Sequence, residues 1–242
     1  MAESLFEHPR MAAVYDALEP DRSDLVPYVA IAKELGARRV LDIGCGTGTF
    51  ALLLADQGVE VTGVDPARSS IDVARAKQGG ERVRWLCGDA TNLPSMRVDL
   101  ATITANVAQE IVEPQDWAGT LRGAYAALRP GGHLVFETRD PARRAWRGWN
   151  RLASYKVTQL QDGTSVRSWV EVMDIAESLV TFRWTYAFAS DGQVLTSVST
   201  LRFRGREEIE ASLKADGFVL QDMRDAPDRP GREFVFIASR PR

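Results

Sequence analysis

Three glycines at every second position mark a stretch of backbone that a ligand could approach closely. They are Gly44, Gly46 and Gly48 in the segment VLDIGCGTGTF, residues 40–50, where one apolar run gives way to another. A turn of this kind binds dinucleotide phosphates when its glycines stand at relative positions one, three and six. Here the sixth position is Thr49, so the spacing departs from the dinucleotide pattern.

A carboxylate, Asp42, stands two residues before the first of these glycines. It would be repelled by a diphosphate and attracted by an ammonium group. The turn therefore suits a nucleoside that carries an amine and no phosphates. Cys45 in the same turn could suggest a thiol nucleophile, but the need for a small residue in a tight turn is the simpler explanation.

Two more carboxylates stand at the ends of apolar runs. Asp65 closes EVTGVD and Asp89 closes RVRWLCGD. Such residues can accept hydrogen bonds from a ligand, but an aspartate after a strand also often caps the helix that follows. Both roles stay open for Asp42, Asp65 and Asp89 from the residues alone.

The segments around these residues alternate between two patterns. Short apolar runs predict strands at 38–44, 60–65, 82–89, 98–105 and 133–140, and amphipathic stretches predict helices at 49–58, 66–79 and 115–132. Gly58 is the predicted end of the first of these helices, and Pro130 stops the last. This alternation predicts an α/β fold with a doubly wound, mostly parallel sheet. A helix at 205–218 and strands near 219–223 and 233–240 would complete seven strands.

The regular alternation stops after residue 150. Residues 155–204 contain only strand-like segments, and the pairs Asp162-Gly163 and Asp191-Gly192 are typical of hairpin turns. In LVTFRWTYAF, large apolar side chains alternate with Thr and Arg, which predicts an antiparallel insertion with one bulky apolar face. We therefore divide the chain into a helical lead-in or lid (1–37), a cofactor-binding core (38–150), the β insertion (151–204) and a closing helix with two strands (205–242).

The lead-in contains one helical pattern, MAAVYDAL, with Pro20 and Pro27 as predicted breaks. Its first residues lack the basic start and apolar centre of a secretory signal. No window approaches eighteen uninterrupted apolar residues, so we expect no membrane span. Two cysteines and two histidines give no zinc-like spacing, and a net charge of −3 gives no reason to expect a nucleic-acid partner. We expect a cytoplasmic protein without a metal.

With these features in place, the segment VLDIGCGTG resembles the first motif of the class I S-adenosylmethionine-dependent methyltransferases of the small-molecule type. The later motifs follow in order: VTGVD, GDATNLP, VDLATITANV and LRPGGHLVFE. The match covers residues 39–140 well and the final helix and strands loosely. The resemblance implies S-adenosylmethionine as cofactor and S-adenosylhomocysteine as product.

The resemblance also implies roles for single residues. Gly44 and Gly46 would let the backbone approach the methionine part of the cofactor, with Asp42 near its ammonium. Asp65 would accept hydrogen bonds from the ribose hydroxyls. Asp89 would accept from the adenine amino group, while the Ala90 amide would donate to the ring. The predicted cofactor contacts also include Cys45, Pro66 and Asn106.

No residue is a signature for one particular methyl acceptor. The candidates for catalysis are Tyr15, Asn106, Gln109 and Asp140, with Glu110, Thr138 and Arg139 beside them after the fourth and fifth strands. A general base is needed only where the acceptor keeps its proton until attack. Tyr15 lies in a helix similar to one that folds over the cofactor in other members of the family, but it could equally be a core aromatic.

The predicted function is methyl transfer by in-line displacement to an N or O atom of a small molecule, by a monomer or homodimer. An RNA or protein methyltransferase is the alternative, and TANVAQ stands where base-modifying amino-methylases carry NPPY. A non-catalytic nucleoside-cofactor-binding protein is a further alternative. The insertion is expected either to close a mostly apolar acceptor pocket with few polar groups or to form a dimer contact.

Overall fold

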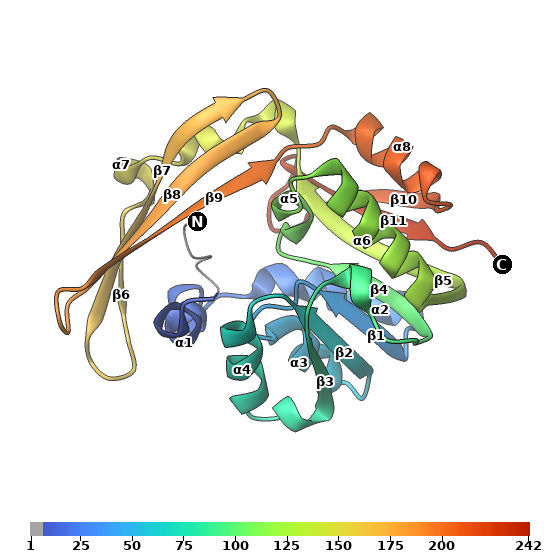
Figure 1. The fold of residues 1–242 in the computed structure, drawn as a ribbon, viewed down its shortest axis with the longest axis horizontal. Helices are drawn as coiled ribbons and strands as arrows, with labels where there is room; N and C mark the ends of the chain where they lie inside the picture. Colours follow the sequence, from blue (N-terminus) through green and yellow to red (C-terminus); the bar gives the residue numbers. More distant parts are fainter. Residues whose placement is uncertain (1–6) are drawn as a thin grey trace.

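A seven-stranded sheet forms the centre of the computed structural model, which describes residues 7–242 (Figure 1). The strands are β1 (Arg39–Ile43), β2 (Glu60–Asp65), β3 (Val83–Cys87), β4 (Val98–Ile103), β5 (Leu128–Arg139), β10 (Val219–Asp225) and β11 (Glu233–Ser239). Their order is β10-β11-β5-β4-β1-β2-β3. Strands β1 to β5 pair in parallel, and β11 is antiparallel to both of its neighbours. The predicted doubly wound, mostly parallel α/β fold is confirmed.

The strand order reverses between β1 and β4. The chain builds outward from β1 through β2 to β3 and then returns to the other side of β1, where Asp42 of β1 pairs with Thr102 of β4. The loops after these two strands leave the sheet in opposite directions, which opens a crevice beyond their carboxyl ends. This is where the glycine turn lies.

Helices cover both faces of the sheet. The helices on one face are α2 (Val26–Glu34), α3 (Thr49–Ala55) and α4 (Arg68–Ala76), and those on the other are α6 (Pro114–Ala127) and α8 (Arg206–Ala215). Three further α-helices lie elsewhere in the described chain: α1 (Pro9–Leu18), α5 (Val107–Glu110) and α7 (Arg151–Ser154). Because successive strand residues point to opposite faces, Val40 packs with the cluster under α2, α3 and α4, while Leu41 packs with the cluster under α6 and α8. None of the helices within residues 7–242 is long and apolar enough to cross a membrane.

Three details of the predicted helices are wrong. The helix predicted at 115–132 ends at Ala127, and Pro130 does not stop it because residues 128–132 already belong to β5. Pro27 is not a break, because it lies in the first turn of α2, where its missing N–H would have no helical partner. Helix α3 ends at Ala55 and not at Gly58. Gly58 instead follows in the left-handed conformation, with φ of +80°, and its amide donates to the Ala55 carbonyl. The first six residues of the lead-in lie outside the described residues.

The predicted β insertion forms a second, separate sheet. It contains β6 (Lys156–Gln159), β7 (Ser165–Ala176), β8 (Leu179–Phe188) and β9 (Val194–Arg202), all antiparallel and in sequence order. The two Asp-Gly pairs lie in the turns before β7 and before β9, as predicted, and both glycines have positive φ. The third turn has no glycine: Glu177 itself adopts φ of +54°.

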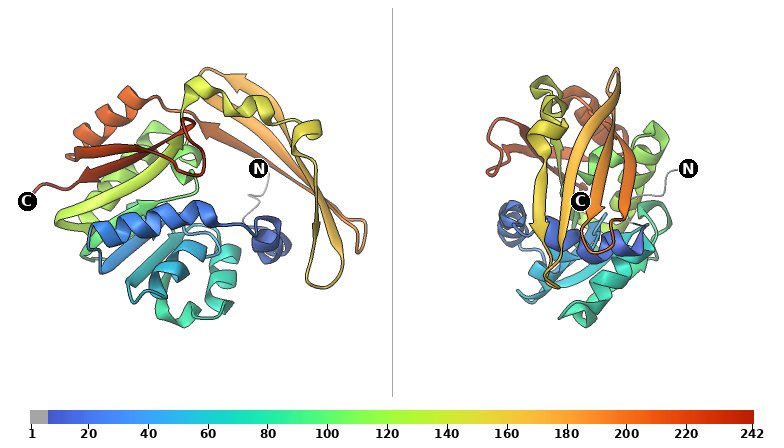
Figure 2. Two further views of the ribbon diagram at one scale, coloured as in Figure 1. Left: turned by 180° about the vertical axis from the view of Figure 1, so that it is seen from behind. Right: turned by 90° about the vertical axis from the view of Figure 1, so that its left-hand side faces the viewer.

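The apolar face of the second sheet packs on two separate parts of the protein. At one end Tyr186 and Phe188 pack with Met11 and Leu18 of α1. At the other end Phe182 and its neighbours pack against the segment that follows β5, where the ring centroids of Trp149 and Phe182 are 4.9 Å apart. The sheet thus extends beside the core from α5 to α1 (Figure 1). Figure 2 shows the same sheet from behind and from the side.

Candidate functional site

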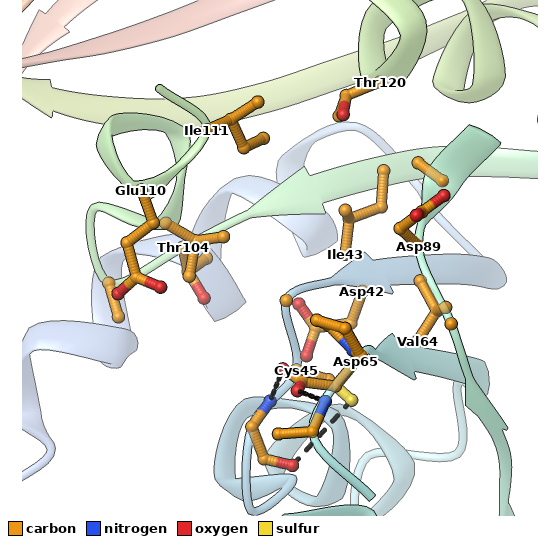
Figure 3. Close-up of a pocket in the computed structure, with 18 of the residues that line it drawn as sticks. Asp42, Ile43, Cys45, Val64, Asp65, Asp89, Thr104, Glu110, Ile111 and Thr120 are labelled. Carbon is orange, nitrogen blue, oxygen red and sulfur yellow. Dashed lines mark hydrogen bonds between the residues drawn. The ribbon is translucent and has the colours of Figure 1, made fainter. Parts of the chain in front are cut away.

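A crevice of about 570 Å³ lies at the carboxyl ends of β1, β2 and β4 and beside the turn after β3 (Figure 3). Most of the residues predicted to contact a cofactor line it together: Asp42, Gly44, Cys45, Gly46, Asp65, Pro66, Asp89 and Ala90. They come from three successive strand-to-helix turns. The parallel sheet brings these turns side by side because its strands all end at the same edge.

The glycine turn has its amides already occupied. The amides of Gly44 and Cys45 both donate to the Val64 carbonyl, at 2.8 and 3.2 Å, and the Gly46 amide donates to Asp65 at 2.8 Å. A phosphate cradle needs such amides to be free. The structure therefore supports the sequence argument against a diphosphate at this turn.

Two of the glycines are needed for different reasons. A Cβ added at Gly44 would lie 2.4 Å from a methyl group of Val107, so only glycine lets α5 approach the turn. A Cβ added at Gly46 would meet nothing within 4 Å, so the backbone there borders open space. Both residues have positive φ, which glycine adopts without strain.

Asp65 holds the turn with both carboxylate oxygens. Oδ2 accepts from the Gly46 amide and Oδ1 accepts from the Ala67 amide, each at 2.8 Å. Burial raises the pKa of Asp65. Each carboxylate oxygen can accept a second hydrogen bond, so Asp65 can anchor the turn before α4 and still bind ligand hydroxyls.

Asp42 is buried with one oxygen lacking a partner. Its Oδ1 accepts from the Thr102 hydroxyl at 3.1 Å, while Oδ2 has no hydrogen bond within the described structure. Burial raises the pKa of Asp42 to about 7, and the nearby Asp65 carboxylate adds to this rise. A ligand cation at this point would stabilise the charged form of Asp42 and satisfy the free oxygen.

Asp89 also combines two roles. One oxygen, Oδ1, accepts from the Thr91 amide at 2.7 Å and so caps the short turn at Ala90–Asn92. The capping role considered for Asp89 from the sequence is therefore present. The residue still lines the crevice, where Figure 3 shows it above Val64 and beside Ile43.

These features together define what the crevice can hold. Its walls offer carboxylate oxygens at three strand ends, and its turn amides are used within the protein. Such walls suit a ligand rich in donors, with hydroxyl groups, an amino group and an ammonium. S-adenosylmethionine has these groups and no phosphate, so the residues present fit the predicted cofactor.

A second cavity of about 530 Å³ adjoins the crevice beneath the second sheet. Four residues line both spaces: Tyr15, Arg22, Ala105 and Glu110. The second sheet supplies apolar and aromatic walls from Val170, Phe182, Trp184 and Leu201. We name this space the acceptor cavity, since the two cavities meet at Glu110 and Tyr15.

The acceptor cavity is far more charged than the sequence predicted. It is lined by the carboxylates of Glu19, Asp21, Asp24, Glu110, Glu137, Asp228 and Glu233 and the guanidinium groups of Arg22, Arg139 and Arg229. The expectation of a mostly apolar pocket with few polar groups is wrong. It considered only the sheet that covers the cavity, whereas the lead-in and the ends of β5 and β11 supply the charges.

Asn106 does not line the crevice, contrary to its predicted cofactor contact. Its backbone is left-handed, with φ of +61°, and its side chain lines the acceptor cavity. The backbone amide of Asn106 donates to Glu137 at 2.9 Å, and its side-chain Nδ2 donates to Glu233 at 3.3 Å. These two carboxylates draw Asn106 toward β5 and β11 and away from β1.

Two other candidates for catalysis line neither cavity. Gln109 is buried, and its Oε1 accepts from the Arg139 guanidinium at 2.9 Å, so it joins α5 to the end of β5. Asp140 accepts from the Ala142 amide and caps the turn after β5. Because β5 continues to Arg139, it carries Asp140 past the cavity. Thr138 is buried and also lines neither space, whereas Arg139 lines the acceptor cavity.

The buried pair of Glu137 and Glu233 was missed at the sequence level. Burial, together with the neighbouring Glu233, raises the pKa of Glu137 to about 8. Arg229 donates to Glu233 at 2.7 Å. A glutamate inside the apolar run of β5 was the available signal, because an ionisable side chain in a buried strand needs a partner.

Arg204 was also missed, and it fixes the position of α5. It is buried, and its guanidinium donates to the carbonyls of Ala108 and Ile111, at 3.0 and 2.6 Å. Burial lowers the pKa of Arg204 to about 10. The chain segment that leaves the second sheet therefore holds the short helix that carries Glu110.

Comparison with known proteins agrees with this geometry. Residues 40–132 match a family described as "Methyltransferase domain". The chain is 34% identical over 119 residues to the cypemycin N-terminal methyltransferase of a Streptomyces species, covering 49% of each protein. It is 38% identical over 109 residues to the ubiquinone biosynthesis O-methyltransferase of Methylocella silvestris, covering 44% of the chain and 41% of the relative. The chain thus spans about half the length of the curated relatives it matches, or less.

Solved structures show the same fold over the whole chain. The CcbJ methyltransferase from Streptomyces caelestis is 23% identical, with a TM-score of 0.76, and the match covers 100% of both chains. The sugar N-methyltransferase KedS8 from Streptoalloteichus is 19% identical, with a TM-score of 0.75, covering 95% of this chain and 93% of that one.

Proposed function

We propose that this chain transfers a methyl group to a small molecule. The premise is that residues 40–132 form a class I S-adenosylmethionine-dependent methyltransferase domain. The observation that carries the proposal is the crevice at the strand-order reversal, lined by Asp42, Asp65 and Asp89. The bound cofactor would supply a methyl group on a sulfonium. Asp42 would hold its ammonium, Asp65 its ribose hydroxyls and Asp89 its adenine amino group.

The protein's contribution to the reaction is positioning and exclusion of water. Methyl transfer from a sulfonium disperses positive charge, so it needs alignment of donor and acceptor more than a site for an oxyanion. Proximity of two reactants can supply ~7 to 11 kcal/mol of a reaction barrier. The shared lining residues Tyr15 and Glu110 would hold the acceptor where the two cavities meet.

We propose further that the second sheet and α1 close the acceptor cavity. The two are tied together: Arg10 of α1 donates to Asp191 at 2.7 Å and lies 3.7 Å from the centre of the Phe188 ring. On the cofactor side, the Thr47 hydroxyl in the glycine turn donates to Asp16 of α1 at 2.7 Å. A covered cavity of about 530 Å³ suits a metabolite better than a polymer.

Neither alternative function is favoured by the site. The carboxylates of the acceptor cavity would repel an RNA backbone. A protein that only binds the cofactor would have no need of a second cavity next to the first. The names of the relatives include both an N-terminal methyltransferase and an O-methyltransferase, so they support neither N nor O transfer above the other.

Calorimetry tests the cofactor part of the proposal. S-adenosylhomocysteine and S-adenosylmethionine should bind at micromolar concentrations, whereas nicotinamide dinucleotides and a short single-stranded RNA should not. Incubation with methyl-labelled cofactor and a metabolite extract should then label a small molecule. Tighter binding of a nicotinamide dinucleotide, or label found only in RNA or protein, would contradict the proposal.

A further inference from the structure

We propose that the acceptor is an amine, bound as a cation in the acceptor cavity, and that Glu110 takes its proton before the methyl group is transferred. This inference rests on the methyltransferase function proposed above. It adds the chemical class of the acceptor and a proton-accepting residue. The evidence comes from the charges in the cavity, the position of Glu110 and one unsatisfied buried oxygen.

The charges that line the acceptor cavity favour a cation. Its carboxylates outnumber its guanidinium groups, and each arginine already has an acidic partner within the protein. Guanidinium nitrogens of Arg139 and Arg229 lie 3.6 and 2.7 Å from a carboxylate oxygen of Glu233. A guanidinium nitrogen of Arg22 lies 3.1 Å from a carboxylate oxygen of Asp24. Glu137 is largely protonated at neutral pH and Glu19 pairs with Lys156, but the remaining carboxylates still outnumber the guanidinium groups. Their negative field attracts an ammonium and repels a carboxylate or phosphate.

Glu110 is the carboxylate best placed to use this field. It is the last residue of α5, is exposed to the two cavities that it lines, and its side chain makes no hydrogen bond or ion pair within residues 7–242. Figure 3 shows it at the opposite side of the crevice from Asp65 and Asp42. Because Arg204 holds the carbonyls at the end of α5, the carboxylate is presented from a fixed backbone.

A second, independent observation points to a ligand that donates a hydrogen bond in the same cavity. Asn106 is only 4% exposed, and its Oδ1 has no hydrogen-bond partner in the described part of the chain. The carboxylate of Glu233 accepts from Nδ2, which fixes the orientation of the amide. A buried acceptor without a donor is costly, and an acceptor amine with two or three N–H groups would satisfy it.

The remaining walls suit an apolar body attached to the amine. Trp149, Phe182 and Trp184 line the cavity beside the charged groups. Aromatic faces also attract a cation that lies above them, which adds to the effect of the carboxylates.

Proton transfer to Glu110 would make the amine reactive. An alkylammonium has a pKa of about 10 and no free electron pair at neutral pH. When its proton moves to the Glu110 carboxylate, the nitrogen pair can form the new N–C bond while the C–S bond breaks and its pair stays on sulfur. The product leaves as a methylated ammonium, and Glu110 then releases the proton it accepted to water, which restores the carboxylate. An alcohol acceptor would also lose a proton to a base, but it would need no cation site.

The proton affinity of Glu110 fits this task. Desolvation by the surrounding protein and the nearby Asp65 carboxylate, opposed by Arg139, raise the pKa of Glu110 to about 7, although the residue is exposed where the two cavities meet. Tyr15 and Arg22 also line both cavities at this point. A base with a pKa near the working pH is the most effective one for proton transfer.

Matched amine and alcohol probes test the inference with methyl-labelled cofactor. The probes are benzylamine and benzyl alcohol, 2-phenylethylamine and 2-phenylethanol, and cyclohexylamine and cyclohexanol. Label should enter amines only. The Glu110→Gln variant should lose about 100-fold or more in kcat/KM for the amines. The matched control is Glu207→Gln, an exposed residue of α8 outside both cavities, which should keep normal activity.

Two further readouts separate the possible failures. S-adenosylhomocysteine should bind equally to all three proteins; if it binds to none, the proposed function fails and not only this inference. In the native protein kcat/KM should rise with pH through about 7. In Glu110→Gln this step should disappear and the rate should rise only toward the pKa of the free amine. Label in alcohols, no label in any amine despite cofactor binding, or an unchanged Glu110→Gln profile would overturn the inference.

Discussion

The two cavities differ in how far apart in the sequence their walls lie. The crevice takes most of its predicted cofactor contacts from residues 42–90, in three consecutive strand-to-helix turns. The acceptor cavity combines the lead-in at 15–24, the end of β4, the end of β5, the second sheet and residues 228–233. The crevice is thus a local feature of the chain, whereas the acceptor cavity exists only after distant segments have packed.

This difference explains how each cavity keeps its shape. In the crevice, neighbouring residues satisfy one another, as when Asp65 accepts from the Gly46 and Ala67 amides. In the acceptor cavity, ion pairs join remote elements, as between Glu233 of β11 and Arg139 of β5. We therefore expect substitutions in the crevice to weaken cofactor binding alone, and substitutions in the acceptor cavity to leave it unchanged.

Gly44→Ala should have the largest effect, because it is the one change expected to damage both cavities. The new Cβ would lie 2.4 Å from Val107 of α5, at a backbone φ of +71°. Left-handed strain costs about 1–2 kcal/mol and overpacking about 1–3 kcal/mol. Urea denaturation should show a loss of roughly 2–5 kcal/mol, and calorimetry should show no binding of S-adenosylhomocysteine.

Gly205→Ala is the matched control for this change. An added Cβ there meets nothing within 4 Å, and its backbone is extended with φ of −73°. Equal stability of the two variants would show that α5 can move away from the glycine turn without cost.

Asp65→Ala should affect the crevice alone. The change removes an acceptor for ligand hydroxyls and releases the Gly46 amide, so it should cost ~2 to 4 kcal/mol of S-adenosylhomocysteine binding, more than tenfold in Kd. Titration calorimetry measures this directly. Asp174→Ala, an exposed position on β7, should bind normally. Unchanged affinity in Asp65→Ala would show that the end of β2 has been assigned the wrong role.

Trp184→Ala should affect the acceptor cavity alone. The indole is half-buried, lines the cavity and packs with both apolar clusters of the second sheet. KM for the acceptor should rise about tenfold, which is ~1.4 kcal/mol, with no change in the Kd of S-adenosylhomocysteine. Val157→Ala, 51% exposed on β6, serves as the control. A normal KM in Trp184→Ala would leave a dimer contact as the better explanation of the insertion.

Glu137→Gln should have the smallest effect, on the pH dependence of stability. The pKa of Glu137 is about 8 in the folded protein and about 4.5 ordinarily, so the folded state binds the proton more tightly. The free energy of unfolding must therefore fall as pH rises from about 4.5 to 8, by less than the ~1.4 kcal/mol per pH unit that a whole proton would give.

The glutamine variant removes that contribution and can still accept from the Asn106 amide. Between pH 5 and pH 8 it should lose about 1 kcal/mol less stability than the native protein in urea denaturation. Asp42 and Glu110 also have raised pKa values, but they contribute equally to the pH dependence of both proteins. The difference in stability between the native protein and the variant therefore reports on Glu137. A slope equal to that of the native protein would mean that Glu137 is already charged at pH 5.

The sequence predicted most of the residues that line the crevice, but it misplaced several of the candidates for catalysis. Asp42, Asp65 and Asp89 line one cavity because each stands at the end of a parallel strand, and strand ends are visible as the last residues of apolar runs. Gln109 and Asp140 follow strands in the same way, yet line neither cavity. Their positions depend on how far β5 continues and on the hydrogen bonds of Arg139, which hydrophobic periodicity does not encode.

The sequence by itself determined the parallel sheet, the glycine turn, the carboxylates beside it and the antiparallel insertion, because alternating polarity and glycine spacing act over a few neighbouring residues. Only the tertiary structure decided that Glu110 stands between two cavities, that Asn106 keeps an unsatisfied oxygen, and that the second sheet rests on α1. These contacts join residues as far apart as Asn106 and Glu233, and Met11 and Phe188. These contacts depend on packing and charge pairing between distant segments, which no local sequence pattern indicates.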